Sequence, residues 1–155
     1  MERVMNLAAA EIWMQEAIIE ARKAESEGEV PVGAILLLNE KIVGRGHNSP
    51  IRLNDPTAHA EILALRQAAR NSTNYRLSGS VLIVTIEPCI MCVGAMIQAR
   101  VEAVVYGAED PKAGAIRSQF QVEDWHRLNH IFQVSSGILQ DECADLIKKF
   151  FASRR

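Results

Sequence analysis

The stretch SVLIVTIEPCIMCVGAMIQARVEAVVY, residues 80–106, decides the fold class. Its first part, Ser80 to Ile86, is short, almost wholly apolar and rich in β-branched residues, as expected of a strand buried on both faces. Pro88 is typical of a helix start, and the pattern predicts a helix through about Ala99. A second strand follows over Val101 to Tyr106. This order of strand, helix and strand predicts an α/β protein with right-handed crossovers.

The rest of the chain supplies further helices and strands around this unit. Apolar residues recur at helical spacing from about Leu7 to Ser26, and Asn39-Glu40 separates the two strands of a predicted hairpin. The other predicted elements are hairpin strands over 30–38 and 41–46, a loop over 48–57, a helix over 58–70, a loop over 107–121, a strand over 131–134 and a helix over 141–151. This order predicts a mixed sheet between helices, in a single domain covering residues 1–155.

The composition is ordinary for a globular protein, with 48% hydrophobic and 23% charged residues among 155. A formal net charge of -2 gives no overall attraction to nucleic acid, so a nucleic-acid partner would have to meet a local basic patch. The N-terminal residues lack the features of a secretory signal, and no apolar run approaches the length that crosses a membrane. We therefore expect a cytoplasmic protein with no membrane partner.

Two short motifs carry the candidate chemistry, His59-Ala60-Glu61 and Pro88-Cys89-Ile90-Met91-Cys92. The chain has three cysteines, which cannot all pair with one another, and two of them stand at C-x-x-C spacing, which points to metal or redox chemistry. If a helix begins near Pro88, the sulfurs of Cys89 and Cys92 lie on the same side of its first turn, where the helix dipole favours thiolates. With His59 they make three zinc ligands and leave the fourth position open, as in catalytic zinc sites.

His59 and Glu61 are expected in the first turn of the helix over 58–70, with Asp55 or Thr57 as its N-cap. Glu61 follows the histidine by two residues, so it lies near the metal without sharing the direction of the imidazole. A water on such a zinc ionises near neutral pH, with a pKa of roughly 7. We therefore expect Glu61 to move protons between this water and a substrate rather than to bind the metal.

The same residues have a plainer interpretation, as a structural zinc clip or a redox-active cysteine pair. Structural clips usually have four protein ligands, often as two closely spaced pairs, and no second ligand stands near His59 at such spacing. His47, His126 and His130 are weaker candidates for the metal. The ligand count favours a catalytic site.

The pattern H-x-E followed by P-C-x-x-C resembles the zinc-dependent cytidine and deoxycytidylate deaminase superfamily. Within it, the chain is similar to the bacterial tRNA adenosine deaminases from the opening helix to about residue 151. The segments that carry this similarity are EVPVGA at 29–34, GHN at 46–48, DPTAHAE at 55–61, EPCIMCVGAMI at 87–97, NH at 129–130 and GIL at 137–139. The resemblance implies a three-layer α/β/α fold with a central mixed sheet of five strands.

The resemblance also implies a reaction and a role for each site residue. A zinc hydroxide attacks C6 of an adenine flipped out at the wobble position of a tRNA anticodon, ammonia leaves and inosine remains. Glu61 would shuttle the protons. The implied ligands of one Zn²⁺ per subunit are His59, Cys89 and Cys92. The residues implied to contact the base are Asn48, which would hydrogen-bond the purine, Val30 and Pro31, which would wall the pocket, and Ala60. A homodimer that binds the anticodon stem-loop is implied as well.

Charged and aromatic residues outside the two motifs are candidates for contact with RNA, because cations meet phosphates and rings contact splayed bases. They are Asp110, Lys112, Arg117, Lys148, Lys149, Phe151 and Arg154. Arg117 stands in a loop where the family usually has glycine, which restricts the backbone and adds a cation. For the C-terminal group a simpler interpretation is helix capping by the lysines and burial of Phe150, Phe151 or both.

Two other functions fit parts of this pattern. A deaminase of free guanine, cytosine or nucleosides would use the same zinc and glutamate on a small ligand. A catalytically silent RNA-binding or zinc-stabilised module is disfavoured, because it has no use for an unliganded glutamate beside an open metal position. The residues around Met91 and the basic, aromatic C-terminus favour RNA, whereas the net charge of -2 mildly disfavours it.

Overall fold

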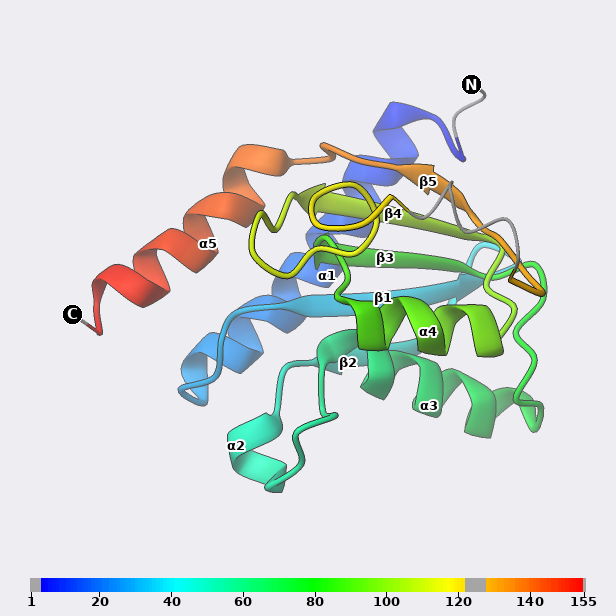
Figure 1. The fold of residues 1–155 in the computed structure, drawn as a ribbon, viewed down its shortest axis with the longest axis horizontal. Helices are drawn as coiled ribbons and strands as arrows, with labels where there is room; N and C mark the ends of the chain where they lie inside the picture. Colours follow the sequence, from blue (N-terminus) through cyan, green and yellow to red (C-terminus); the bar gives the residue numbers. More distant parts are fainter. Residues whose placement is uncertain (1–3, 122–127, 155) are drawn as a thin grey trace.

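The computed structural model of the chain describes residues 4–121 and 128–154 (Figure 1). In chain order its elements are α1 (Leu7–Ser26), β1 (Gly33–Leu38), β2 (Lys41–His47), α2 (Pro50–Leu53), α3 (Ala60–Ser72), β3 (Val81–Ile86), α4 (Ile90–Gln98), β4 (Ala103–Ala108), β5 (Gln133–Ser135) and α5 (Gln140–Ala152). None of the helices in the described ranges is long and apolar enough to cross a membrane.

In the described part of the chain, five strands form one sheet in the order β2-β1-β3-β4-β5. β1 is antiparallel to both β2 and β3, whereas β4 is parallel to both β3 and β5. The hairpin between β1 and β2 turns at Asn39 and Glu40, whose φ angles of 52° and 61° suit the right-handed twist of the two strands. The predicted mixed sheet of five strands is confirmed.

Helices cover both faces of the sheet and produce three layers (Figure 1). Side chains alternate along β1, so that Ala34 and Leu36 pack with α3 and α4, whereas Ile35 and Leu37 pack with α1 and α5. The interior of β3 is buried on both faces, as its apolar sequence predicts. The α/β/α fold expected from the sequence is confirmed.

Two glycines allow the helices to approach the hairpin closely. A Cβ atom on Gly33 would lie 2.0 Å from the backbone oxygen of Ala17 in α1, and one on Gly46 would lie 2.2 Å from that of Ala60 in α3. Because both distances are far inside van der Waals contact, only glycine fits at these positions. The start of α3, where the first motif lies, is thereby held directly against β2.

Several element boundaries differ from the sequence prediction. The segment predicted as a loop over 48–57 contains the short helix α2, whose first residue, Pro50, has a ring that already fixes φ for a helix. β1 begins at Gly33 rather than Val30, because a tight turn with a 2.8 Å hydrogen bond from the N–H of Val32 to the carbonyl of Val30 precedes it. β5 covers 133–135 rather than 131–134, and β4 continues through Ala108, into the predicted loop over 107–121.

Candidate active site

Three side chains from two helix starts converge on one point. The Nδ1 atom of His59 lies 3.6 Å from the sulfur of Cys89 and 3.6 Å from that of Cys92, and the three donor atoms all lie within 4.8 Å of one another. Tetrahedral zinc with ordinary bond lengths separates a nitrogen ligand from a sulfur ligand by roughly 3.6 Å. The donor set and its spacing therefore fit zinc.

The weaker histidine candidates lie elsewhere. Nε2 of His47 is 2.8 Å from the carboxylate of Glu27, and Nε2 of His130 is 2.6 Å from the carbonyl oxygen of Val101. His126 lies outside the described residues. Within residues 4–121 and 128–154, the trio of histidine and two cysteines is the one group of His, Cys, Asp or Glu donors arranged to hold a metal ion.

His59 and Cys89 are the N-caps of α3 and α4. The prediction that His59 lies inside the first turn, with Asp55 or Thr57 as N-cap, is wrong. Asp55 instead accepts hydrogen bonds from the N–H (2.8 Å) and the hydroxyl (2.7 Å) of Thr57, in a turn that ends before the helix. α4 likewise begins after Cys89 and not at Pro88. Both helices therefore present their positive N-terminal ends to the donor cluster, which stabilises thiolates.

Hydrogen bonds within the cluster favour one ionised sulfur. The hydrogen bond from Cys92, with a further contribution from His59, lowers the pKa of the Cys89 thiol to about 4. The same contact with Cys89 raises the pKa of Cys92, and the hydrogen bond to Cys89 raises the pKa of His59. The metal-free pair therefore holds one thiolate, which is the form that binds zinc.

Glu61 lies in the first turn of α3 and is only 3% exposed. Burial raises the pKa of its carboxyl to about 6, because the charged form has lost its hydration. The side chain is not one of the three converging metal donors. A buried carboxyl that titrates near neutral pH can take up and release a proton, so the environment of Glu61 supports the predicted role of proton shuttle.

Asn48 connects the segment before α2 to the start of α3. Its side-chain oxygen accepts a hydrogen bond from the N–H of Ala60 (2.9 Å), and its own backbone N–H donates to the carbonyl of Val32 (3.1 Å). Among the described residues, nothing accepts a hydrogen bond from the side-chain NH₂ group, which is therefore available to a ligand. The methyl group of Ala60 is buried in the core, so this residue is not placed to touch a ligand with its side chain. Its backbone N–H instead holds the side chain of Asn48.

The predicted pocket wall, with Val30 half-buried and Pro31 buried, is anchored by a residue that sequence reasoning missed. Glu29 is 2% exposed, and its carboxylate accepts hydrogen bonds from the N–H groups of Ile51 (3.2 Å) and Arg52 (2.8 Å) at the start of α2. The sequence feature that could have indicated this role is the position of the glutamate directly before two apolar site residues. Its contacts join the two chain segments that carry the predicted base contacts.

Residues 8–108 match the cytidine and deoxycytidylate deaminase zinc-binding region. The chain belongs to this deaminase family. It is 49% identical over 146 residues to a tRNA-specific adenosine deaminase of Haemophilus influenzae, with 94% of this chain and 84% of that protein covered. A tRNA-specific adenosine deaminase of Bacillus subtilis is 44% identical over 145 residues, with 94% and 90% covered.

Solved structures agree with this assignment. One from a study of A-to-I editing by tRNA:A34 deaminases superposes on this deaminase with a TM-score of 0.84 at 41% identity, covering 87% of this chain and 98% of that chain. A guanine deaminase of Bacillus subtilis superposes with a TM-score of 0.64 at 34% identity, covering 79% and 76%. Zinc, predicted from the motifs, is confirmed as the cofactor of this deaminase by the family and by the converging donors.

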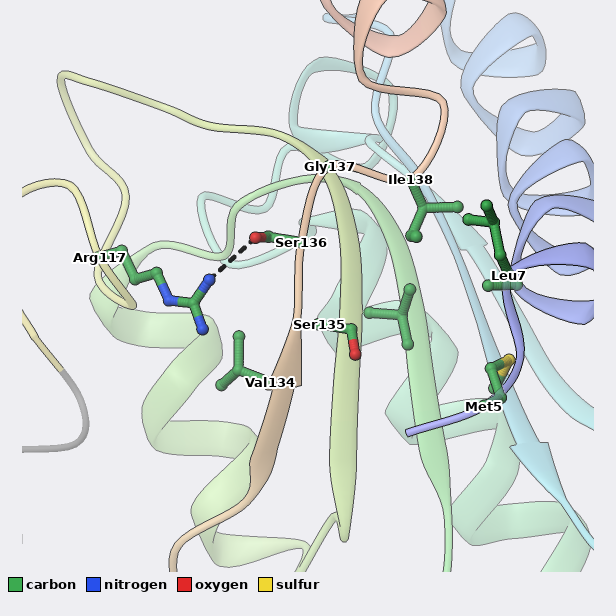
Figure 2. A pocket seen from close by; sticks show the side chains of 10 residues that line it. Met5, Leu7, Arg117, Val134, Ser135, Ser136, Gly137 and Ile138 are labelled. Carbon is green, nitrogen blue, oxygen red and sulfur yellow. Dashed lines mark hydrogen bonds between the residues drawn. The ribbon is translucent and has the colours of Figure 1, made fainter. Parts of the chain in front are cut away.

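The deaminase carries Asp110, Lys112 and Arg117 on the segment that follows β4. The Asp110 carboxylate accepts a hydrogen bond from the backbone N–H of Lys112 (3.1 Å), and the Lys112 side chain is exposed. Arg117 instead reaches the chain after β5, where it donates to the hydroxyl of Ser136 (2.9 Å) at a cavity of about 340 Å³ (Figure 2). Of these three predicted RNA contacts, Lys112 is the one with an exposed charge, while Asp110 and Arg117 make contacts within the protein.

The predicted RNA contacts at the C-terminus of this deaminase divide into two kinds. Lys148 and Lys149 in α5 are exposed, and Phe151 is 47% exposed, whereas Phe150 is buried. The guanidinium of Arg154 lies 3.8 Å from the centroid of the Phe150 ring and donates to a backbone carbonyl in the loop after α1 (3.4 Å). Arg154 therefore packs against the protein but stays exposed, so all four predicted contacts are accessible to a ligand.

Proposed function

We propose that this deaminase converts adenosine to inosine at the wobble position of tRNA anticodons. The observation that carries the proposal is its identity of 49% and 44% to two tRNA-specific adenosine deaminases, over 94% of the chain in each case. The converging donors and the buried Glu61 supply the groups that a hydrolytic deamination requires. The reaction consumes one water and releases one ammonia.

The site residues divide this reaction between metal binding and proton transfer. His59, Cys89 and Cys92 would hold the zinc, which when bound supplies a water that ionises near neutral pH. Glu61 takes one proton from this water and passes it to N1 of the purine, and the remaining hydroxyl proton then passes through Glu61 to the departing amine, which leaves a C6 carbonyl. A C6–O bond forms, the C6–N bond breaks and ammonia leaves.

Asn48 is proposed to orient the purine. Because its side-chain oxygen is held by the N–H of Ala60, the NH₂ group has a fixed direction and can donate to an acceptor nitrogen of the base. Val30 and Pro31 supply apolar surface for a base that has lost its stacking neighbours. These contacts select a flipped-out purine.

The anticodon stem-loop is the proposed partner, in the cytoplasm, where the edited tRNA is used. With a net charge of -2, this deaminase has to attract phosphates through local groups. The exposed side chains suited to this are Lys112, Lys148 and Lys149, with Phe151 as a ring that can contact a splayed base.

A homodimer is proposed from the family resemblance, and one groove lined mainly by apolar residues supports it. The groove has a volume of about 490 Å³, lies between α3 and α4 and is lined mainly by apolar residues, including Ile62, Leu65 and Ala95. It reaches Thr57 and Met91, next to the two motifs, so a partner subunit there would lie beside the site. Light scattering should give twice the chain mass of 17.2 kDa, and a mass of one chain at micromolar concentration would contradict this.

The function is tested by incubating the zinc-loaded protein with an anticodon stem-loop that carries a wobble adenosine. We expect inosine and ammonia in equal amounts. The similarity to a guanine deaminase makes free guanine, together with cytosine and cytidine, the necessary comparison. If these small molecules react readily and the stem-loop does not, the proposed tRNA substrate is wrong.

A further inference from the structure

Five hydrogen bonds converge on the carboxylate of Glu87, which is 1% exposed and lies two residues before the metal ligand at 89. Its Oε2 atom accepts from the backbone N–H groups of Ile116 (3.0 Å), Arg117 (2.8 Å) and Ser118 (3.0 Å). Its Oε1 atom accepts from the N–H of Asp110 (3.2 Å) and from the hydroxyl of Ser118 (2.5 Å). One buried side chain therefore fixes both ends of the segment over 110–118.

This segment is wrapped so tightly around the carboxylate that a side chain cannot be placed at its centre. A Cβ atom on Gly114 would lie 2.3 Å from the carboxylate carbon of Glu87 and within 2.5 Å of both its oxygens. Such distances require the glutamate or the segment to move. The observed position of the Glu87 carboxylate therefore requires glycine at 114.

The segment over 110–118 also lies directly beside the metal site. The N–H of Ala115 donates to the carbonyl of Pro88 (2.9 Å), and Gly114 and Cys89 form an isolated antiparallel bridge. The positions at the tip of the segment, 111–113, are exposed, and they include Lys112. The segment therefore connects the zinc-binding turn to the exposed surface at 111–113. A ligand larger than one base would contact this surface.

We propose that Glu87 is a positioning residue for RNA specificity, which shapes the segment over 110–118 so that it contacts nucleotides beside the deaminated base. The proposal rests on the proposed tRNA substrate. Glu87 itself is buried and bound to backbone groups, so it acts through the segment and not on the base. Contacts with flanking nucleotides exist both before and during the reaction, so their loss weakens RNA binding more than it slows the chemical step.

The direct test is Glu87→Gln, which keeps the shape of the side chain but turns one acceptor oxygen into an NH₂ donor. Each carboxylate oxygen accepts at least two hydrogen bonds. In either orientation of the glutamine amide, its NH₂ group would therefore face N–H or O–H groups that are themselves donors. We expect about one zinc per chain, little change in kcat and a KM for the stem-loop raised about tenfold or more. Backbone amides at 116–118 should exchange hydrogen faster than in the native protein.

Gly114→Ala supplies an independent variant. It should raise KM for the stem-loop in the native background and add little when Glu87 is also replaced by alanine, because the atoms that the new methyl group meets are then absent. The control is Glu20→Gln, which alters another buried carboxylate that is bound instead by Lys23 and Arg45. We expect this control to affect stability without raising KM.

An unchanged KM in Glu87→Gln, an equal rise in the Glu20→Gln control, or additive effects of the changes at 87 and 114 would each overturn the proposal. Failure of the proposed function would look different, because the native protein would then leave the stem-loop unreacted. In that case the hydrogen exchange at 116–118 still reports whether Glu87 holds the segment, since this measurement involves no RNA.

Discussion

Glu61 is buried beside the metal donors without being one of them. Its burial raises the pKa to about 6 in the metal-free site, and a bound zinc cation nearby would lower it again by stabilising the carboxylate. In the zinc-loaded site the side chain is then ionised at neutral pH, which is the form that accepts a proton from water. The carboxylate is therefore suited to carry a proton from water to the leaving amine.

Replacing this carboxyl by an amide of the same shape tests the role. Glu61→Gln should keep about one zinc per chain, since the three donors are unchanged, and should reduce kcat about 10²–10⁴-fold, the usual contribution of a general acid or base. The exposed Glu11→Gln in α1 serves as the control and should have native activity. Metal analysis measures the zinc content, and single-turnover rates measure the chemical step. Substantial residual turnover in Glu61→Gln would rule out proton transfer by this residue.

At the scale of elements, the start of α3 depends on a side chain from outside the helix. The N-cap residue, His59, makes no side-chain capping hydrogen bond, and Asn48 accepts a hydrogen bond from the N–H of Ala60 in its place. The same side chain thus supports the helix through its oxygen and faces a ligand through its nitrogen. Substitutions can separate these two tasks.

Asn48→Asp retains the acceptor for the start of α3 and removes the NH₂ donor. We expect near-native thermal stability and zinc content, with kcat/KM for the stem-loop reduced about tenfold or more, as for loss of a buried hydrogen bond. Asn48→Ala removes both contacts and should lower stability as well. Steady-state kinetics and thermal unfolding of the two variants test this; native kcat/KM in the aspartate variant would show that the NH₂ group does not bind the base.

The elements themselves were largely predictable, because their signals are local. The apolar runs of β1 and β3, both buried along their interiors, and the turn at Asn39 and Glu40 follow from neighbouring residues. The starts of α3 and α4 were predicted two residues too early, whereas the start of α1 at Leu7 was predicted correctly. Asp55 and Thr57 are better N-caps than histidine by type, but they hydrogen-bond each other in a turn before α3. These two residues could either cap the helix or form the turn before it, and packing in the folded protein determines which of the two structures forms.

The site shows the same division between local and distant contacts. His59, Glu61, Cys89 and Cys92 are recognisable because short spacings place them at two helix starts. The anchoring role of Glu87 could not be found this way, since its partners lie 23 to 31 residues further along the chain. Likewise, Arg154 looks like an RNA contact by charge, and only the fold shows that it packs on the Phe150 ring.

For the whole molecule, the sheet brings the two motifs together, whereas the proposed RNA contacts lie on separate segments. α3 and α4 lie on the same face of the sheet, so that their starts supply the metal donors and Glu61 (Figure 1). The exposed cations suited to RNA come from the segment after β4 and from α5. A compact metal site combined with dispersed cations agrees with a long, folded substrate better than with a free base.

The central claim is tested most directly by comparing ammonia release from two anticodon stem-loops of equal length and charge. One carries adenosine at the wobble position, and the other carries it at the neighbouring anticodon position with guanosine at the wobble position. The account predicts one ammonia and one inosine per molecule of the first stem-loop, and little product from the second or from free guanine, cytosine and cytidine. Equal reaction of both stem-loops, or reaction of the free bases alone, would contradict it.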